Sequence, residues 1–248
     1  MNSKVIKKVV IAICLLVISM IASLFLDNKG VFLNKNKKLP IYSVGIEEKK
    51  VSITFDVNWG DNNTIKILDI LDKYNVKATF FLIGNWIEDF PKEVEEIAKR
   101  GHEIGNHSNT HPDMTKITKE KIIHELSITD GKILKVTGKS TKLFRFPSGS
   151  YNDFSVEAVN SLGYYCIQWD VDSIDWKAEG EEKEYDRVMK NTKPGSILLF
   201  HNDGKYTPKT LPRIIEDLKS KGYEFETVGN LIYKENFHIN HEGRQVKQ

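Results

Sequence analysis

The chain has 248 residues, of which 40% are hydrophobic and 28% are charged, a composition that excludes a disordered or collagen-like protein. Lys and Arg number 36 against 34 Asp and Glu, so no basic excess points to nucleic acid as a partner. With only two cysteines, Cys14 and Cys166, neither a disulfide framework nor a cysteine-rich metal site can be built.

The first 26 residues have the pattern of a signal anchor or signal peptide. Three lysines precede residues 9–26, a run without charge that is just long enough to span a bilayer. Because no small-residue cleavage motif ends this run, we favour an uncleaved anchor over a cleaved signal peptide. We therefore expect a membrane-anchored protein with its body outside the cytoplasm, or a secreted protein if cleavage occurs. Residues 27–38, rich in Asn, Lys and Gly, are expected to form a tether.

The body, residues 39–234, alternates predicted strands and helices. Its first β-rich runs, 41–44 and 51–55, flank a charged turn and suggest a hairpin. The further expected strands are 78–83, 102–106, 143–146, 164–169, 196–200 and 223–228, and the expected helices are 64–74, 88–100, 119–136, 153–162, 185–191 and 210–221. This alternation, with about seven strands, predicts an α/β fold with one (β/α) barrel-like domain, followed by a polar tail at 235–248.

Unusual polar residues follow the predicted strands, where α/β barrels carry their functional groups. Asp56 and His201 each come directly after an apolar run. His107 and His111 are spaced so that two imidazoles can share one cation, and zinc accepts such nitrogen ligands. Taken singly, each feature is more typical of a cap, a turn or a solvated loop. Five clusters in chain order, at 56, 107–111, 145–149, 172–176 and 201, instead indicate one functional site.

The ordered motifs resemble those of the polysaccharide deacetylases, the NodB-homology carbohydrate esterases, over about residues 40–232. The five motifs lie at 54–56, 107–111, 145–149, 172–176 and 199–201. The resemblance implies an irregular (β/α) barrel. The Phe-Asp-Val-Asn-Trp-Gly variant of the first motif and the short anchored layout are most similar to the sporulation-associated deacetylases of spore-forming Gram-positive bacteria.

The resemblance implies hydrolysis of N-acetyl groups on amino sugars of a cell-wall polysaccharide, and an outward-facing anchor favours peptidoglycan. His107 and His111 would bind a divalent metal, with zinc as the first expectation and cobalt or nickel as alternatives. The metal would polarise the amide carbonyl and lower the pKa of a bound water. We expect a monomer whose partners are the polysaccharide and the membrane.

The resemblance also assigns roles to the acid, the base and their neighbours. Asp56 would act as general base and His201 as general acid. Arg145 would hold Asp56 ionised, and Asp175 would orient His201 and favour its charged form. Two further residues would complete the pocket: Ser148, whose N–H helps to hold the oxyanion, and Trp176, which forms a wall.

One residue departs from the family pattern. The family has two adjacent aspartates in its first motif, the second a metal ligand, but here Val57 follows Asp56. Because catalytic zinc usually has three protein ligands, either waters complete the site or an oxygen of Asn58 or Asp61 stands in. If residue 57 faces the metal, Val57→Asp restores a ligand, although strand alternation leaves its direction open. The competing hypothesis is a catalytically impaired glycan-binding or structural wall protein that keeps the deacetylase fold.

Overall fold

The computed structural model of the protein describes residues 37–248, and residues 38–248 form one compact unit. The predicted anchor at 1–26 and nearly all of the predicted tether at 27–38 lie outside the described residues. Within the described part of the chain, no helix combines the length and the apolar character that crossing a membrane requires.

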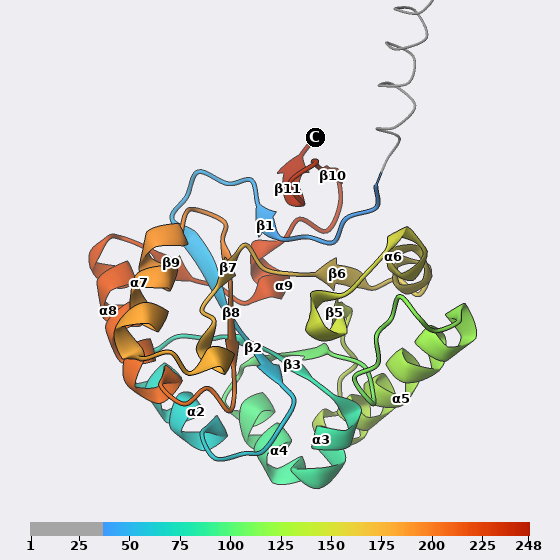
Figure 1. Ribbon diagram of the computed structural model, residues 1–248, viewed down its shortest axis with the longest axis horizontal. Coiled ribbons are helices and arrows are strands. Elements are labelled where there is room, and N and C mark those ends of the chain that lie inside the picture. Colours follow the sequence, from blue (N-terminus) through green and yellow to red (C-terminus); the bar gives the residue numbers. More distant parts are fainter. Residues whose placement is uncertain (1–36) are drawn as a thin grey trace, which may run out of the picture. The chain divides into compact units, whose positions relative to one another are not determined.

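A sheet of parallel strands, curved into a half-barrel, forms the centre of this unit (Figure 1). Seven strands follow the order β6-β5-β4-β3-β2-β8-β7, and a short β9 also pairs with the start of β2. Their bounds are β2 Lys50–Val57, β3 Thr79–Leu82, β4 Glu103–Asn106, β5 Leu143–Arg145, β6 Tyr165–Ile167, β7 Val171–Asp172, β8 Ile197–His201 and β9 Glu224–Phe225. The α/β architecture agrees with the prediction, and the barrel is irregular because its edge strands β6 and β7 do not pair with each other.

Helices pack around the outside of the sheet, with α7 and α8 towards one edge and α5 and α6 towards the other (Figure 1). Their bounds are α2 Thr64–Lys73, α3 Gly84–Asp89, α4 Pro91–Lys99, α5 Lys119–Thr137, α6 Asp153–Asn160, α7 Glu181–Asn191, α8 Thr207–Ser220 and α9 Val228–Leu231, with short 3₁₀ turns η1 Pro147–Gly149 and η2 Asp175–Lys177. The predicted helix at 88–100 overlaps two helices, α3 and α4. Pro91 has no N–H to continue α3 and instead begins α4.

Alternation along β2 separates the apolar core from the barrel interior. One face is fully buried in the apolar cluster between the sheet and α2, α4 and α8; it consists of Val51, Ile53, Phe55 and Val57. Each such side chain contributes about 1.5–3 kcal/mol by leaving water. Successive strand residues point to opposite faces, so Thr54 and Asp56 project into the interior. The local sequence of β2 thus places a carboxylate at the strand end inside the barrel.

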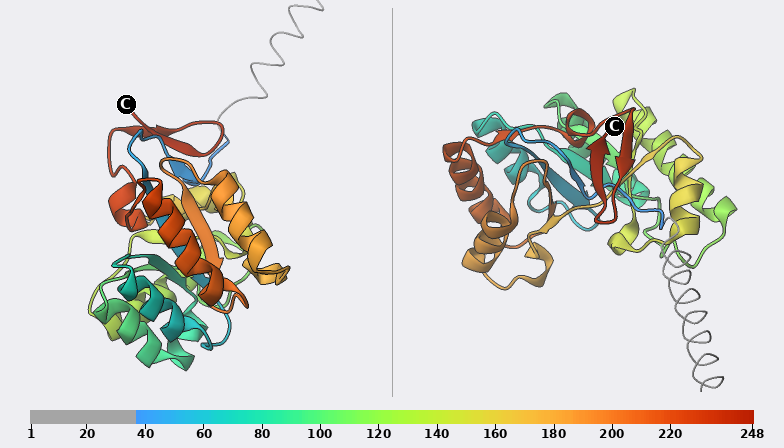
Figure 2. Two further views of the ribbon diagram at one scale, coloured as in Figure 1. Left: turned by 90° about the vertical axis from the view of Figure 1, so that its left-hand side faces the viewer. Right: turned by 90° about the horizontal axis from the view of Figure 1, so that it is seen from above.

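The predicted hairpin at 41–55 is wrong, because both edges of β2 are already occupied. β3 and β8 pair with β2 in parallel, and β1 (Ser43–Val44) pairs with β11 (Arg244–Lys247) instead. The segment expected to be a polar tail, 235–248, contains an antiparallel hairpin of β11 and β10 (Phe237–Ile239). Figure 2 shows this hairpin outside the half-barrel. The buried Gln245 side chain fastens it by accepting the Tyr233 N–H at 2.8 Å and donating to the Tyr233 carbonyl at 2.7 Å.

Candidate active site

A pocket of about 470 Å³ lies at the carboxyl ends of the parallel strands, a volume within the range of small-ligand sites. Six of the eight predicted site residues line it: Asp56, His107, His111, Ser148, Trp176 and His201. The other two, Arg145 and Asp175, are buried behind Asp56 and His201 respectively. The structure therefore brings all eight residues together at one end of the barrel.

Asp56 is held by Arg145, a fully buried guanidinium from the end of β5. Arg145 Nη1 donates to Asp56 Oδ1 at 2.7 Å and to Thr54 Oγ1 at 2.9 Å. Its Nη2 donates to the Gln168 carbonyl at 3.1 Å, and the guanidinium lies 4.0 Å from the centre of the Phe81 ring. Burial by itself raises the pKa of Asp56, but the positive charge of Arg145 outweighs burial and holds that pKa below its usual value. Asp56 is therefore ionised at neutral pH.

His107 presents an unprotonated nitrogen to the pocket. Its Nδ1 donates to the main-chain carbonyl of Arg145 at 2.9 Å, which leaves the lone pair on Nε2. Nε2 lies 3.5 Å from Asp56 Oδ2 and has no hydrogen-bond partner. Burial lowers the pKa of His107 to about 4. The ring is consequently neutral at neutral pH, which is the form that binds metal ions.

The loop that carries His111 is fixed by a buried carboxylate of α5. Glu125 accepts the main-chain N–H groups of Asn109 and Thr110 at 2.9 and 2.7 Å. His111 itself has φ = 57°, a left-handed conformation that is uncommon for residues other than glycine. Its ring centroid lies 5.0 Å from that of His107. Strain of this kind gathers at binding and catalytic sites, and here it occurs at a residue whose ring packs edge-on against the first imidazole.

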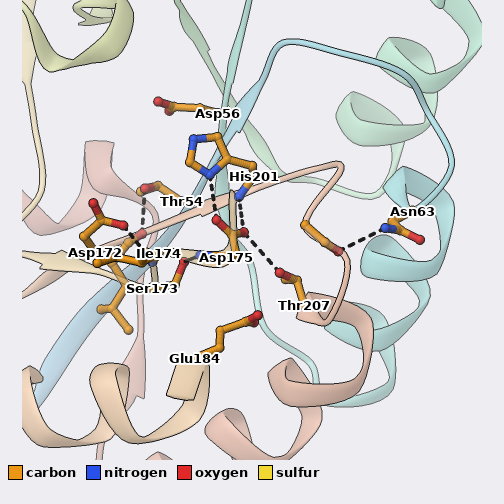
Figure 3. Close-up of polar contacts among 12 residues, drawn as sticks. Thr54, Asp56, Asn63, Asp172, Ser173, Ile174, Asp175, Glu184, His201 and Thr207 are labelled. Carbon is orange, nitrogen blue, oxygen red and sulfur yellow. Dashed lines mark hydrogen bonds and ion pairs between the residues drawn. The ribbon is translucent and has the colours of Figure 1, made fainter. Parts of the chain in front are cut away.

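His201 lies beside Asp56 on the neighbouring strand and is tied to a buried carboxylate (Figure 3). Asp175 Oδ1 accepts from His201 Nδ1 at 2.7 Å. Its Oδ2 accepts from the His201 main-chain N–H at 2.7 Å and from Thr207 Oγ1 at 3.1 Å. Burial by itself lowers the pKa of His201, but the hydrogen bond and the charge of Asp175 outweigh burial and raise that pKa to about 9. His201 therefore carries a proton at neutral pH.

Two tryptophans form exposed parts of the pocket wall. Trp176 was expected there, whereas Trp59 was not; their exposed fractions are 59% and 62%. The indole of Trp59 lies edge-on to His111, with 6.3 Å between ring centroids. Its position three residues after Asp56 was a signal that sequence reasoning passed over. Ser148, whose N–H was predicted to help hold the oxyanion, also lines the pocket and has φ = 52° within the turn η1.

Sequence reasoning also missed the polar groups behind Asp175. Thr207 at the start of α8 donates to Asp175, and Glu184 of α7 lies close by (Figure 3). Glu184 accepts a hydrogen bond from Thr210. Burial raises the pKa of Glu184 to about 7. These residues belong to no motif, and only the packing of α7 against α8 brings them to the site.

Val57 does not line the pocket. Its side chain is fully buried in the apolar cluster outside the barrel, because β2 continues to Val57 and alternation turns this residue away from Asp56. The direction of residue 57, which the sequence left open, is therefore outward, away from the predicted metal ligands. The next residue, Asn58, lines the pocket instead, whereas Asp61 does not.

The predicted metal ligands suit a divalent cation, although they do not form a complete set by themselves. Among residues 37–248, no three His, Cys, Asp or Glu side chains are grouped so as to hold a metal ion. His107 nevertheless offers a buried, neutral and unpartnered Nε2. Burial also lowers the pKa of His111, so both imidazoles are available as neutral nitrogen donors.

Comparison with known proteins identifies the family. A family model described as polysaccharide deacetylase matches residues 44–167, half of the chain. The chain belongs to the polysaccharide deacetylase family. This confirms the predicted family and the assignment of the chain as a polysaccharide deacetylase. The closer resemblance to the sporulation-associated subgroup stays a prediction.

Several relatives cover most of the domain. Peptidoglycan-N-acetylmuramic acid deacetylase PdaA of Bacillus subtilis (strain 168) is 34% identical over 202 residues, which cover 80% of this chain and 77% of PdaA. The structure of PdaA, a family 4 carbohydrate esterase, matches with a TM-score of 0.74 over 77% of this chain and 84% of that chain, at 34% identity. A peptidoglycan-N-acetylglucosamine deacetylase of Bacillus cereus is 33% identical over 195 residues, 77% of this chain and 71% of the relative.

One structural relative is a pseudoenzyme. A family 4 pseudoenzyme from Bacillus anthracis is 36% identical and matches with a TM-score of 0.75, over 77% of this chain and 68% of that chain. A mutant of the same pseudoenzyme with restored enzymatic activity matches equally well. The fold of this family is therefore shared by active and inactive members, and activity has to be argued from the site.

Proposed function

We propose that this deacetylase uses a divalent metal to remove N-acetyl groups from amino sugars of the cell wall, with peptidoglycan as its substrate. One observation carries the proposal: an ionised carboxylate, Asp56, lies next to a protonated imidazole, His201, in a single pocket. Amide hydrolysis needs both, because water must lose a proton and the departing amine must gain one. The names of the relatives in Bacillus subtilis and Bacillus cereus support peptidoglycan as the substrate.

The protein's own groups supply the proton transfers. Asp56 takes a proton from the attacking water, and Arg145 holds it ionised for that purpose. His201 donates the proton on its Nε2 to the amine as the C–N bond breaks. The proton on its Nδ1 stays in place, hydrogen-bonded to Asp175. Ser148 contributes its N–H to the oxyanion.

The remaining groups of the pocket would bind the metal and the sugar. His107 and His111 would hold a divalent metal, which when bound would supply polarisation of the amide carbonyl and a lower pKa for water. Zinc is the first expectation, with cobalt and nickel as alternatives, since imidazole suits all three. Trp176 offers a flat apolar surface against the sugar ring or the acetyl group.

Release of acetate tests the proposal directly. Full-length protein in detergent is treated with a chelator and then given peptidoglycan or chitooligosaccharides, with and without zinc, cobalt or nickel. We expect acetate from peptidoglycan only when metal is present. If neither glycan yields acetate with any of the three metals, the proposed activity is wrong.

The cellular setting is part of the same proposal. An anchor at residues 1–26 would hold the domain on the outer face of the membrane, and the form of the first motif supports a role in sporulation. We expect detergent, but not high salt, to release the native protein from membranes. A strain that lacks the protein is expected to form spores with a more heavily acetylated wall.

The pseudoenzyme relative and Val57 favour a second candidate, a glycan-binding or structural wall protein. Such a protein would sediment with insoluble peptidoglycan yet release no acetate from it. The paired groups Asp56–Arg145 and His201–Asp175 favour catalysis, because glycan binding alone requires no base beside an acid.

A further inference from the structure

Asn58 occupies the position next to Asp56 on the interior side of the barrel. Alternation directs residues 54 and 56 inward and turns Val57 into the apolar cluster, and Asn58 then returns to the interior. Asn58 lines the same pocket as Asp56, His107 and His111. Asn58 therefore belongs to the same pocket as the two imidazoles, at the point where the chain leaves β2.

The side-chain oxygen of Asn58 has no hydrogen-bond partner among the described residues. Of the buried side-chain polar atoms that lack a partner among the described residues, two belong to residues of this pocket: Asn58 Oδ1 and His107 Nε2. Both bear lone pairs. A buried acceptor without a partner costs about 1–3 kcal/mol. A divalent cation accepts such lone pairs, so two unpartnered acceptors on residues of one pocket suit a metal ion.

We propose that Asn58 Oδ1 is the third protein ligand of the metal site, together with His107 and His111. This inference rests on the proposed metal-dependent function and assigns the oxygen that the missing aspartate would otherwise supply. The three donors are neutral, so the site attracts a cation less strongly than a set that includes a carboxylate. The protein should accordingly bind zinc more weakly than its own Asn58→Asp variant.

Metal binding, measured apart from catalysis, tests the assignment. Zinc is titrated calorimetrically into full-length, chelator-treated protein in detergent, and the visible absorption of bound cobalt reports the donor set. Asn58→Ala is expected to weaken zinc binding by about tenfold or more, and Asn58→Asp to tighten it by about tenfold. Asp61→Ala is the matched control: it removes a carboxylate from the same loop, but Asp61 does not line the pocket, so zinc binding should stay unchanged.

The outcomes separate the ligand assignment from the proposed function. If Asn58→Ala binds zinc as tightly as the wild type and leaves the cobalt spectrum unchanged, Asn58 is not a ligand, while acetate release by the wild type still supports the function. If Asp61→Ala alone weakens binding, the ligand is Asp61. If the wild type binds neither metal, the assignment is wrong, and the acetate assay then decides independently whether the chain is active. Thermal unfolding followed by circular dichroism verifies that each variant is folded.

Discussion

His107, directly after β4, and His201, the last residue of β8, line the same pocket, yet their surroundings give them opposite protonation states. Nδ1 of His107 meets a main-chain carbonyl, whereas Nδ1 of His201 meets the carboxylate of Asp175. The pKa of His107 falls to about 4 because burial dominates, and that of His201 rises to about 9 because Asp175 outweighs burial. The partner behind the ring thus decides whether a buried histidine is neutral or protonated at neutral pH.

The largest effect is expected from removing the partner of His201. Asp175→Asn keeps the shape but loses the charge, so the pKa of His201 should fall below neutrality and kcat should decrease by about a thousandfold. Acetate release as a function of pH and the NMR titration of His201 measure both effects. Asp89→Asn, an exposed change on α3, is the control and should leave both unchanged. A retained pKa near 9 in Asp175→Asn would show that Asp175 does not set it.

An aspartate at position 57 should change the stability of the fold without changing metal binding. Val57→Asp would bury an unpaired charge in the apolar cluster and lower the free energy of unfolding by about 3 kcal/mol. We expect no gain in zinc affinity. Asn58→Asp adds the same group on the opposite face and should cost much less in urea unfolding. A stable Val57→Asp variant with tighter zinc binding would contradict the orientation of β2 described here.

The pKa of His201 also predicts how stability depends on pH. Because the pKa is about 9 in the folded chain and about 6.5 in the unfolded one, the folded state holds this proton more tightly. The resulting stabilisation is fully present below about pH 6.5 and is lost as pH rises through 9, a change on the order of 3 kcal/mol. Urea unfolding across this range should give a steeper alkaline decline for the wild type than for His201→Gln. Parallel curves would mean that His201 contributes nothing to the decline.

The smallest effects are expected at the two exposed tryptophans. Trp59 lies against His111, and Trp176 follows Asp175, so each borders one of the two histidine environments. Trp59→Ala and Trp176→Ala should each raise KM for peptidoglycan by up to about tenfold, about 1.4 kcal/mol, with kcat largely retained. Phe154→Ala removes another exposed aromatic ring, which does not line the pocket, and is expected to change neither constant. A loss of kcat without a change in KM would argue against a role in sugar binding.

Much of the site was predictable because parallel strands share one carboxyl edge. Once Asp56, His107 and His201 were placed at the carboxyl ends of parallel strands, the barrel had to bring them to one edge. The errors lie where pairing depends on distant segments. The run 41–44 has the composition of a hairpin strand, but its partner is β11, about 200 residues away in the sequence. Likewise, the polarity of 235–248 concealed a hairpin held by one buried side chain, Gln245.

The sequence by itself determined the alternation of strands and helices, the family and the identity of the residues at the strand ends, because these depend on local periodicity and on motif order. Only the tertiary structure decided that Val57 turns away from the pocket and that Asn58 enters it, since the last pleat of β2 is set by its pairing with β3 and β8. It also decided the charges of the site. A pKa depends on burial and on the nearest charge, and for Asp56 that charge is Arg145, which lies 89 residues further along the chain.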